Sequence, residues 1–129
     1  MQLIRKNRGF TLVEIMIVVA IIALLAAIAV PGFLRARKRS QGTIMKNDLR
    51  LIDAAKDQYA IEYNKSNMTP SFTDLTPYFK SGTRLALGNN DLFGNGYAIN
   101  DLQTLPQVNG STKSGLSDVL DDNFWSPYQ

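Results

Sequence analysis

The sequence predicts an α+β fold, in which one long N-terminal helix packs against a small C-terminal antiparallel sheet and short helices. Three observations lead to this fold class. Residues 15–34, "IMIVVAIIALLAAIAVPGFL", are uncharged and nearly all apolar, which favours a helix that is apolar on every side. A helical spacing of apolar residues then continues to about Asn64. From Leu85 onward, Gly and Asn separate short apolar runs, a pattern typical of turns and short strands.

The first half of the helix, residues 10–34, is predicted to cross a membrane. The run of 20 residues from 15 to 34, at a rise of about 1.5 Å per residue, matches the roughly 30 Å hydrocarbon core of a bilayer. Pro31 lacks an N–H and precedes Gly32, so we expect a kink or a loosened turn at this level.

Two other interpretations of the apolar run remain open. A buried core helix of this length would need a large protein around it. A cleaved secretory signal would explain the basic stretch before the run and the small-residue triplet at 27–29. Glu14 interrupts that layout, however, and four cations follow the triplet within ten residues, where they oppose translocation.

The second half of the helix, residues 35–64, is predicted to be exposed and amphipathic. Its apolar residues recur at spacings of 4, 3, 3, 4 and 4, which places them on one face. That face must pack on another part of the chain. The stripe consists of Met45, Leu49, Ile52, Ala55, Tyr59 and Tyr63.

Residues 65–129 are predicted to form the small globular part that covers this stripe. Ser71 is a candidate cap for a short helix and Ser117 for a later one. Strands are expected at 96–100 and 104–108, and because a hairpin is not stable alone, we expect them to lie across the helix. Phe124 and Trp125 are expected to dock on the stripe.

Composition argues against an enzyme and against nucleic-acid binding. The chain has 14 Lys and Arg, 11 Asp and Glu, and neither Cys nor His, so thiolate metal sites, disulfides and the commonest general base are excluded. From Ser40 onward, seven basic residues stand against ten acidic ones, which leaves no basic patch for nucleic acid. No phosphate-binding glycine motif or catalytic constellation is present.

The stretch "RKNRGFTLVEIMIVVAIIALLAAIAVPGF" closely resembles the prepilin signature of the type IV pilin superfamily, which includes the pseudopilins of type II secretion. The resemblance covers about the first 35 residues. It implies that residues 1–9 are a leader, which prepilin peptidase removes by cleaving between Gly9 and Phe10. Phe10 would then be the N-methylated mature terminus, and Glu14 matches the acidic position linked to assembly and methylation.

Elementary electrostatics gives Glu14 a reason to lie beside an apolar segment. Cleavage before Phe10 creates an ammonium four residues ahead of Glu14, about one helical turn away, where the unpaired N–H groups of the helix start also carry partial positive charge. An unpaired buried charge is costly, so matching ammonium to carboxylate would set the register between subunits. Whether Glu14 receives its own terminus or a neighbour's stays open.

The resemblance implies a structural subunit of a type IV pilus-like or type II secretion pseudopilus filament, assembled through its N-terminal helix. Its expected partners are copies of itself, related pilin-like subunits, prepilin peptidase, an inner-membrane assembly platform and membrane lipid. The subunit would wait in a bacterial inner membrane with its C-terminal part in the periplasm, and then join a periplasmic or cell-surface filament. The alternative is a monomeric membrane-anchored or secreted binding domain.

The segment "DLFGNGY" is similar to a turn found in major pseudopilins, although Leu92 and Gly96 depart from that pattern. Major pseudopilins usually follow the turn with an acidic calcium-binding loop, which is missing here. The clustered carboxylates are Asp118, Asp121 and Asp122. Calcium takes 6–8 oxygen ligands, so we expect these residues to be solvated or to cap helices, with calcium as the alternative, and we expect no other cofactor.

Overall fold

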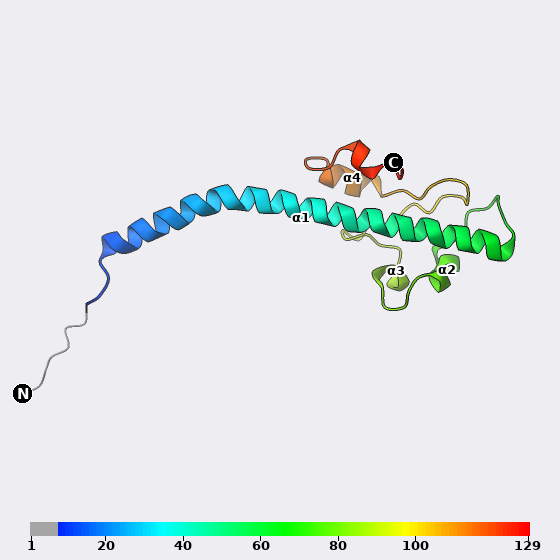
Figure 1. Cartoon of the computed structure of the whole chain (residues 1–129), viewed down its shortest axis with the longest axis horizontal. Coiled ribbons are helices and arrows are strands. Elements are labelled where there is room, and N and C mark those ends of the chain that lie inside the picture. Colours follow the sequence, from blue (N-terminus) through cyan, green and yellow to red (C-terminus); the bar gives the residue numbers. More distant parts are fainter. Residues whose placement is uncertain (1–7) are drawn as a thin grey trace, which may run out of the picture. The chain divides into compact units, whose positions relative to one another are not determined.

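The computed structural model describes residues 8–129 (Figure 1). Residues 1–7, most of the predicted leader, lie outside the described residues. The chain divides into two compact units, Met1–Ala36 and Arg37–Gln129. The long helix α1, Leu12–Tyr63, contributes to both. The predicted division of the helix after Leu34 stays a prediction.

In the first unit, α1 exposes its apolar side chains. Helix α1 is long and apolar enough, by length and composition, to cross a membrane, and none of its most apolar stretch is buried. Leu24 and Leu25, for example, are 65% and 62% exposed. The helix runs without a break through Pro31 and Gly32, and the kink expected there stays a prediction.

In the second unit, α1 supplies one wall of the core. Five of the six predicted stripe residues are buried, and Tyr63 is 54% exposed. Tyr63 is the last residue of α1, and its ring packs at a tilt against that of Tyr59, with ring centroids 4.7 Å apart. Asn64 follows with φ 48°, the left-handed conformation that commonly ends a helix, so the helix ends where the sequence predicts.

Short helices complete the second unit. Ser71 caps the first of them, and its backbone N–H donates to the Asp74 carboxylate at 2.9 Å, as in a capping box. The helices are α2 (Phe72–Leu75), η1 (Thr76–Tyr78), α3 (Arg84–Leu87), α4 (Gly110–Leu116) and η2 (Asp122–Trp125). Figure 1 shows α2 and α3 on one side of α1 and α4 on the other.

The predicted role of Ser117 as a helix start is wrong. Ser117 ends α4, whose N-cap is Asn109, and the final 3-10 turn η2 is capped by Asp121. An acceptor side chain placed before the first free N–H groups is what a cap requires, and Asn and Asp provide it here. The predicted docking of the C-terminal aromatics is confirmed, because Trp125 is fully buried in the same apolar cluster as the stripe residues and the partly buried Phe124 packs against that cluster.

The predicted antiparallel sheet is not formed within residues 8–129. Ala98 and Gln107 exchange both backbone hydrogen bonds at 2.9 Å, but this pair is an isolated bridge, as is the pair Asn90 and Gly96. Towards the expected hairpin turn, the next hydrogen-bonded pair would be Asn100 with Leu105, but Asn100 has φ 58° and so leaves the extended conformation. Pairing therefore stops after one step.

Lys56 on α1 holds the segment where a sheet was expected. It is 1% exposed, and its Nζ donates to the carbonyl of Ile99 at 2.9 Å and to that of Thr104. Burial lowers the pKa of Lys56 below its usual 10.5. A buried ammonium requires such acceptors, so these carbonyls bond to a side chain of α1 instead of to a neighbouring strand.

The C-terminal segment packs closely against α1 at Gly42. A Cβ at this buried position would overlap Leu120 Cδ1 and lie 3.1 Å from the Phe124 ring. Lys46, one turn further along α1, donates to the Phe124 carbonyl at 2.8 Å. Glycine at position 42 thus allows the segment before Trp125 to pack directly on the helix.

Candidate processing and assembly site

The predicted cleavage bond lies in non-helical backbone. Gly9 and Phe10 precede α1 and are both exposed, Phe10 by 85%. A Cβ on Gly9 would have no heavy atom within 4 Å. The two residues on either side of the predicted cut therefore project from the start of the helix without packing on the described parts of the chain.

Thr11 and Glu14 form a reciprocal cap at the start of α1. The Thr11 N–H donates to Glu14 Oε2 at 2.8 Å, and the Glu14 N–H donates to Thr11 Oγ1 at 3.2 Å. This is the capping-box arrangement, in which two of the unpaired N–H groups at a helix start are satisfied. The carboxylate also lies at the positive end of the helix dipole.

The cap supplies a partner for Glu14 that sequence reasoning missed. The pattern Thr-x-x-Glu before an apolar run is a known signature of a helix start, and "TLVE" at 11–14 carries it. In the uncleaved chain the Glu14 carboxylate bonds within its own first turn. The predicted roles of Phe10 and Glu14 in assembly, and of Gly9 and Phe10 in processing, stay predictions.

The three C-terminal carboxylates each have a different partner. An oxygen of Asp118 lies 2.7 Å from Lys38 Nζ, and one of Asp122 lies 3.0 Å from Lys113 Nζ. The Asp121 side chain accepts from the Phe124 N–H at 3.0 Å, which caps η2. Residues 8–129 contain no group of three or more Asp, Glu, His or Cys placed to hold a metal ion.

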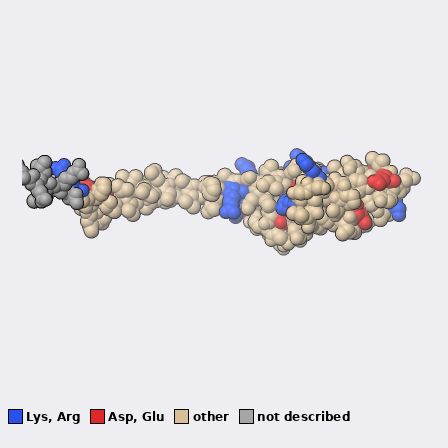
Figure 2. Space-filling view, turned by 90° about the horizontal axis from the view of Figure 1, so that it is seen from below, with Lys and Arg blue, Asp and Glu red and all other residues tan. Residues whose placement is uncertain are grey.

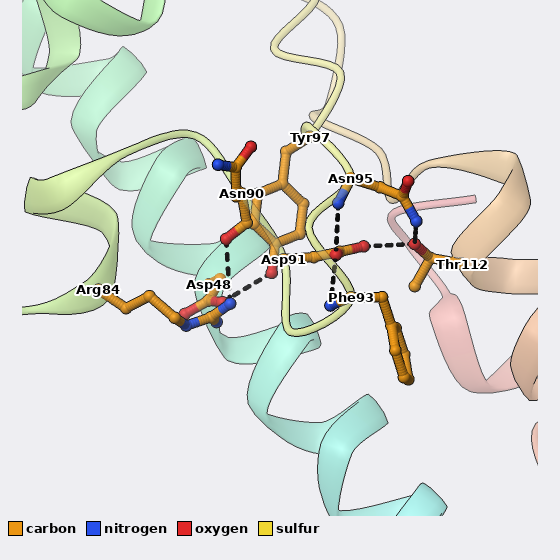
Figure 3. A network of polar contacts seen from close by, with 8 residues as sticks. All are labelled: Asp48, Arg84, Asn90, Asp91, Phe93, Asn95, Tyr97 and Thr112. Carbon is orange, nitrogen blue, oxygen red and sulfur yellow. Dashed lines mark hydrogen bonds and ion pairs between the residues drawn. The ribbon is translucent and has the colours of Figure 1, made fainter.

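The turn "DLFGNGY" is organised by the Asp91 carboxylate (Figure 3). Asp91 is 5% exposed, and its Oδ1 accepts from the N–H groups of Phe93 at 2.8 Å and Asn95 at 2.9 Å. Its Oδ2 accepts from the Thr112 hydroxyl, whose oxygen also accepts from Asn95 Nδ2 at 2.8 Å. Gly94, with φ 85°, supplies the left-handed residue that the turn requires. The turn is thereby joined to α4.

A second set of polar contacts joins the same turn to α1. Asp48, 7% exposed on the buried face of α1, accepts from the Tyr97 hydroxyl at 2.7 Å and pairs with Arg84 of α3. Arg84 also donates to the Asn90 carbonyl at 3.0 Å. Burial raises the pKa of Tyr97 to about 12. Figure 3 shows these side chains converging from α1, α3 and the turn.

Sequence reasoning found the turn but not its partners. Asp91, Asn95 and Tyr97 lie in the segment similar to the pseudopilin turn, whereas Asp48 and Arg84 were not singled out. One signal existed, because Asp48 lies three residues after Met45 and four before Ile52, which places it on the same face of the helix as the apolar stripe. A buried carboxylate must find a donor. Nothing in the sequence identifies Arg84 as that donor.

The N-terminal segment is similar in sequence to that of known proteins. Residues 4–30 match the family model for the prokaryotic N-terminal methylation motif. The start of the chain therefore carries a prokaryotic N-terminal methylation motif. The chain is 43% identical over 72 residues to the type IV major pilin protein PilA of Myxococcus xanthus and 43% identical over 60 residues to the type IV wide pilus major component PilA4 of Thermus thermophilus. It is 41% identical over 58 residues to the type II secretion system core protein G of Pseudomonas aeruginosa.

These pilin-like similarities cover only part of each protein. The three alignments span 50%, 46% and 45% of this chain, and 33%, 46% and 41% of the respective relatives. The chain thus matches between a third and a half of the length of these relatives. No solved structure matches the chain.

Proposed function

We propose that the protein is a structural subunit of a type IV pilus-like or type II secretion pseudopilus filament, assembled through α1. The observation that carries this proposal is the methylation motif at residues 4–30, which includes the start of α1, where the apolar residues are exposed. The relatives named above are a major pilin, a wide-pilus component and a secretion core protein. Copies of this chain and related subunits would be its partners.

The proposal includes processing and storage in a membrane. Prepilin peptidase would cleave between Gly9 and Phe10, and Phe10 would be methylated on its new amine. The exposed, non-helical backbone at this bond supports access for a protease. The subunit would wait in the inner membrane, with its C-terminal part in the periplasm, until an assembly platform moves it into a filament.

The capping box suggests how Glu14 could serve both states. In a lone subunit the carboxylate accepts from Thr11 N–H, so it is not left without a donor beside lipid. In a filament, the ammonium of a neighbouring subunit would lie against it. Because an ammonium carries a full positive charge and an amide N–H only a partial one, the carboxylate would be attracted more strongly to the ammonium.

The experiment that tests this proposal combines N-terminal analysis with microscopy in the source bacterium. We expect mass spectrometry of the mature protein to show N-methylated Phe10, and electron microscopy of sheared surface fractions to show filaments that contain the chain. Glu14→Ala should leave cleavage intact and reduce filaments at least tenfold. Glu62→Gln, which also removes one carboxylate from α1 but in the second unit, is the matched control and should leave filaments unchanged.

Three results would contradict the proposal. A mature terminus at Val30 would indicate a secreted domain. Filaments of normal abundance and register from Glu14→Ala would show that the carboxylate has no part in assembly. Absence of the protein from filaments and pseudopili, although it is processed at Phe10, would show that it is not a filament subunit.

A further inference from the structure

The second unit begins with a basic cluster, defined here as Arg37, Lys38 and Arg39. Arg37 and Arg39 are exposed, and Lys38 is half-buried with its Nζ near Asp118. Arg37 and Arg39 are two residues apart on α1, so they point to opposite sides of the helix. Figure 2 shows Lys and Arg side chains gathered where the long uncharged surface ends.

The cluster follows the apolar run almost immediately. Leu34 is the last apolar residue of the run, and at about 1.5 Å per residue Arg37 and Arg39 lie roughly 4.5 and 7.5 Å further along the helix. The headgroup layer adds about 5–8 Å on each side of the hydrocarbon core. When residues 15–34 span a bilayer, both guanidinium groups reach the level of the lipid phosphates.

The chemistry of the cluster fits phosphate. A guanidinium is planar and always charged, and it binds phosphate oxygens through two parallel N–H donors. Lipid phosphates surround a spanning helix on every side, so cations on opposite sides of α1 are both used. Between Glu14, before the apolar run, and Asp48, which is buried, α1 carries no acidic residue that would repel such a headgroup.

We propose that Arg37 and Arg39 bind the headgroup phosphates of anionic phospholipids in the leaflet on the C-terminal side of the span. This inference rests on the membrane-stored state of the proposed function. Anionic lipid is favoured over zwitterionic lipid because a zwitterionic headgroup carries its own cation, which competes with the arginines. Each cation near an anionic membrane surface is worth about a fivefold preference.

The position of the cluster is not explained by topology signals. Three Lys and Arg precede the apolar run and four follow it. The positive-inside rule, by which Lys and Arg concentrate in the cytoplasmic flank of a span, predicts an excess on one side only. Binding of lipid phosphates would explain why cations follow the apolar run, on the C-terminal side of the span. A subunit leaving the membrane for a filament gives up these contacts, so anionic lipid would hold the stored subunit in place.

The test uses the full chain in phosphatidylcholine vesicles that contain spin-labelled phosphatidylglycerol or spin-labelled phosphatidylcholine. The ratio of the motionally restricted fractions measures lipid preference. We expect the unsubstituted chain to prefer phosphatidylglycerol about fivefold or more, and Arg37→Gln/Arg39→Gln to lower that preference at least threefold. Lys65→Gln/Lys80→Gln removes two exposed cations elsewhere in the second unit and should keep the preference. Arg37→Lys/Arg39→Lys keeps both charges but loses the paired N–H donors, so it should keep only part of the preference.

A competition measurement separates a lipid headgroup from free phosphate as the occupant. Inorganic phosphate should weaken the preference no more than sodium chloride of equal ionic strength, because the occupant is a lipid headgroup. Equal association of both lipids with the unsubstituted chain, an equal loss in the Lys65/Lys80 control, or specific displacement by free phosphate would overturn the proposal. Mass spectrometry and microscopy test the filament separately, so a lipid preference without filaments would refute only the proposed function.

Discussion

The two halves of α1 are both helical, but their apolar side chains lie in different environments. In the first unit the apolar residues are exposed, as Leu24 is by 65%. In the second unit the apolar residues of one stripe are buried, and Asp48 and Lys56 on that side bond to other elements. The difference shows that forming a helix does not by itself determine which environment surrounds its side chains. The first half requires lipid or other helices around it, whereas the second half is covered by its own chain.

The sharpest way to break this comparison is to make the same substitution in both halves. Leu49 is fully buried, so Leu49→Ala should lower the free energy of unfolding of the second unit by about 2–5 kcal/mol. Leu24→Ala should change it by less than about 0.5 kcal/mol. Denaturant unfolding of the full chain in detergent micelles, followed by Trp125 fluorescence, measures both. Equal losses would show that the halves are not independent.

The two glycines of α1 allow the same comparison of the two halves by adding a methyl group instead of removing side-chain atoms. Ala at position 42 would overlap Leu120 and crowd Phe124, whereas Ala at position 32 would meet nothing within 4 Å. Gly42→Ala should destabilise the second unit by about 2 kcal/mol. Gly32→Ala should not lower its stability, because Ala favours helix over Gly. The same unfolding measurement tests both, and a neutral Gly42→Ala would mean that the C-terminal segment repacks freely.

Periodicity predicted the helical part of the fold because it is a local property. The spacing from Met45 to Tyr59 fixed the buried face, and the helix ends at Tyr63, one residue before Asn64. The sheet was predicted from apolar runs between turns, but strand pairing depends on non-local partners. Lys56, more than forty residues away in the sequence, donates hydrogen bonds to the carbonyls of Ile99 and Thr104. No local sequence pattern predicts these bonds.

The candidate site shows the same division between local and distant signals. The capping box of Thr11 and Glu14 is contained in four residues, and its signature was available in the sequence. The pair between Asp48 and Arg84 joins residues that are 36 positions apart, and only the folded chain brings them together. The local pattern at residues 11–14 therefore offered a signal for the cap, although sequence reasoning missed it, whereas no local pattern identifies the pair between Asp48 and Arg84.

The smallest effect concerns the pH dependence of that network. Burial raises the pKa of Tyr97 from 10.0 to about 12. Between these values the unfolded chain releases the phenolic proton while the folded chain keeps it. The free energy of unfolding therefore falls as pH rises from about 10 to about 12, and the contribution is fully present below pH 10.

Tyr97→Phe should make this alkaline fall shallower, because the variant has no phenol at that position to titrate. It also loses the hydrogen bond to Asp48, so its stability at pH 7 should be lower by about 1 kcal/mol. Tyr63→Phe, at a tyrosine that is 54% exposed, is the matched control and should leave the slope unchanged. Unfolding curves collected at intervals from pH 8 to 12 give the slopes. If Tyr97→Phe and Tyr63→Phe had the same slope as the unsubstituted chain, the Tyr97 hydroxyl would titrate as if it were in water, and the second unit would not exclude solvent from Asp48.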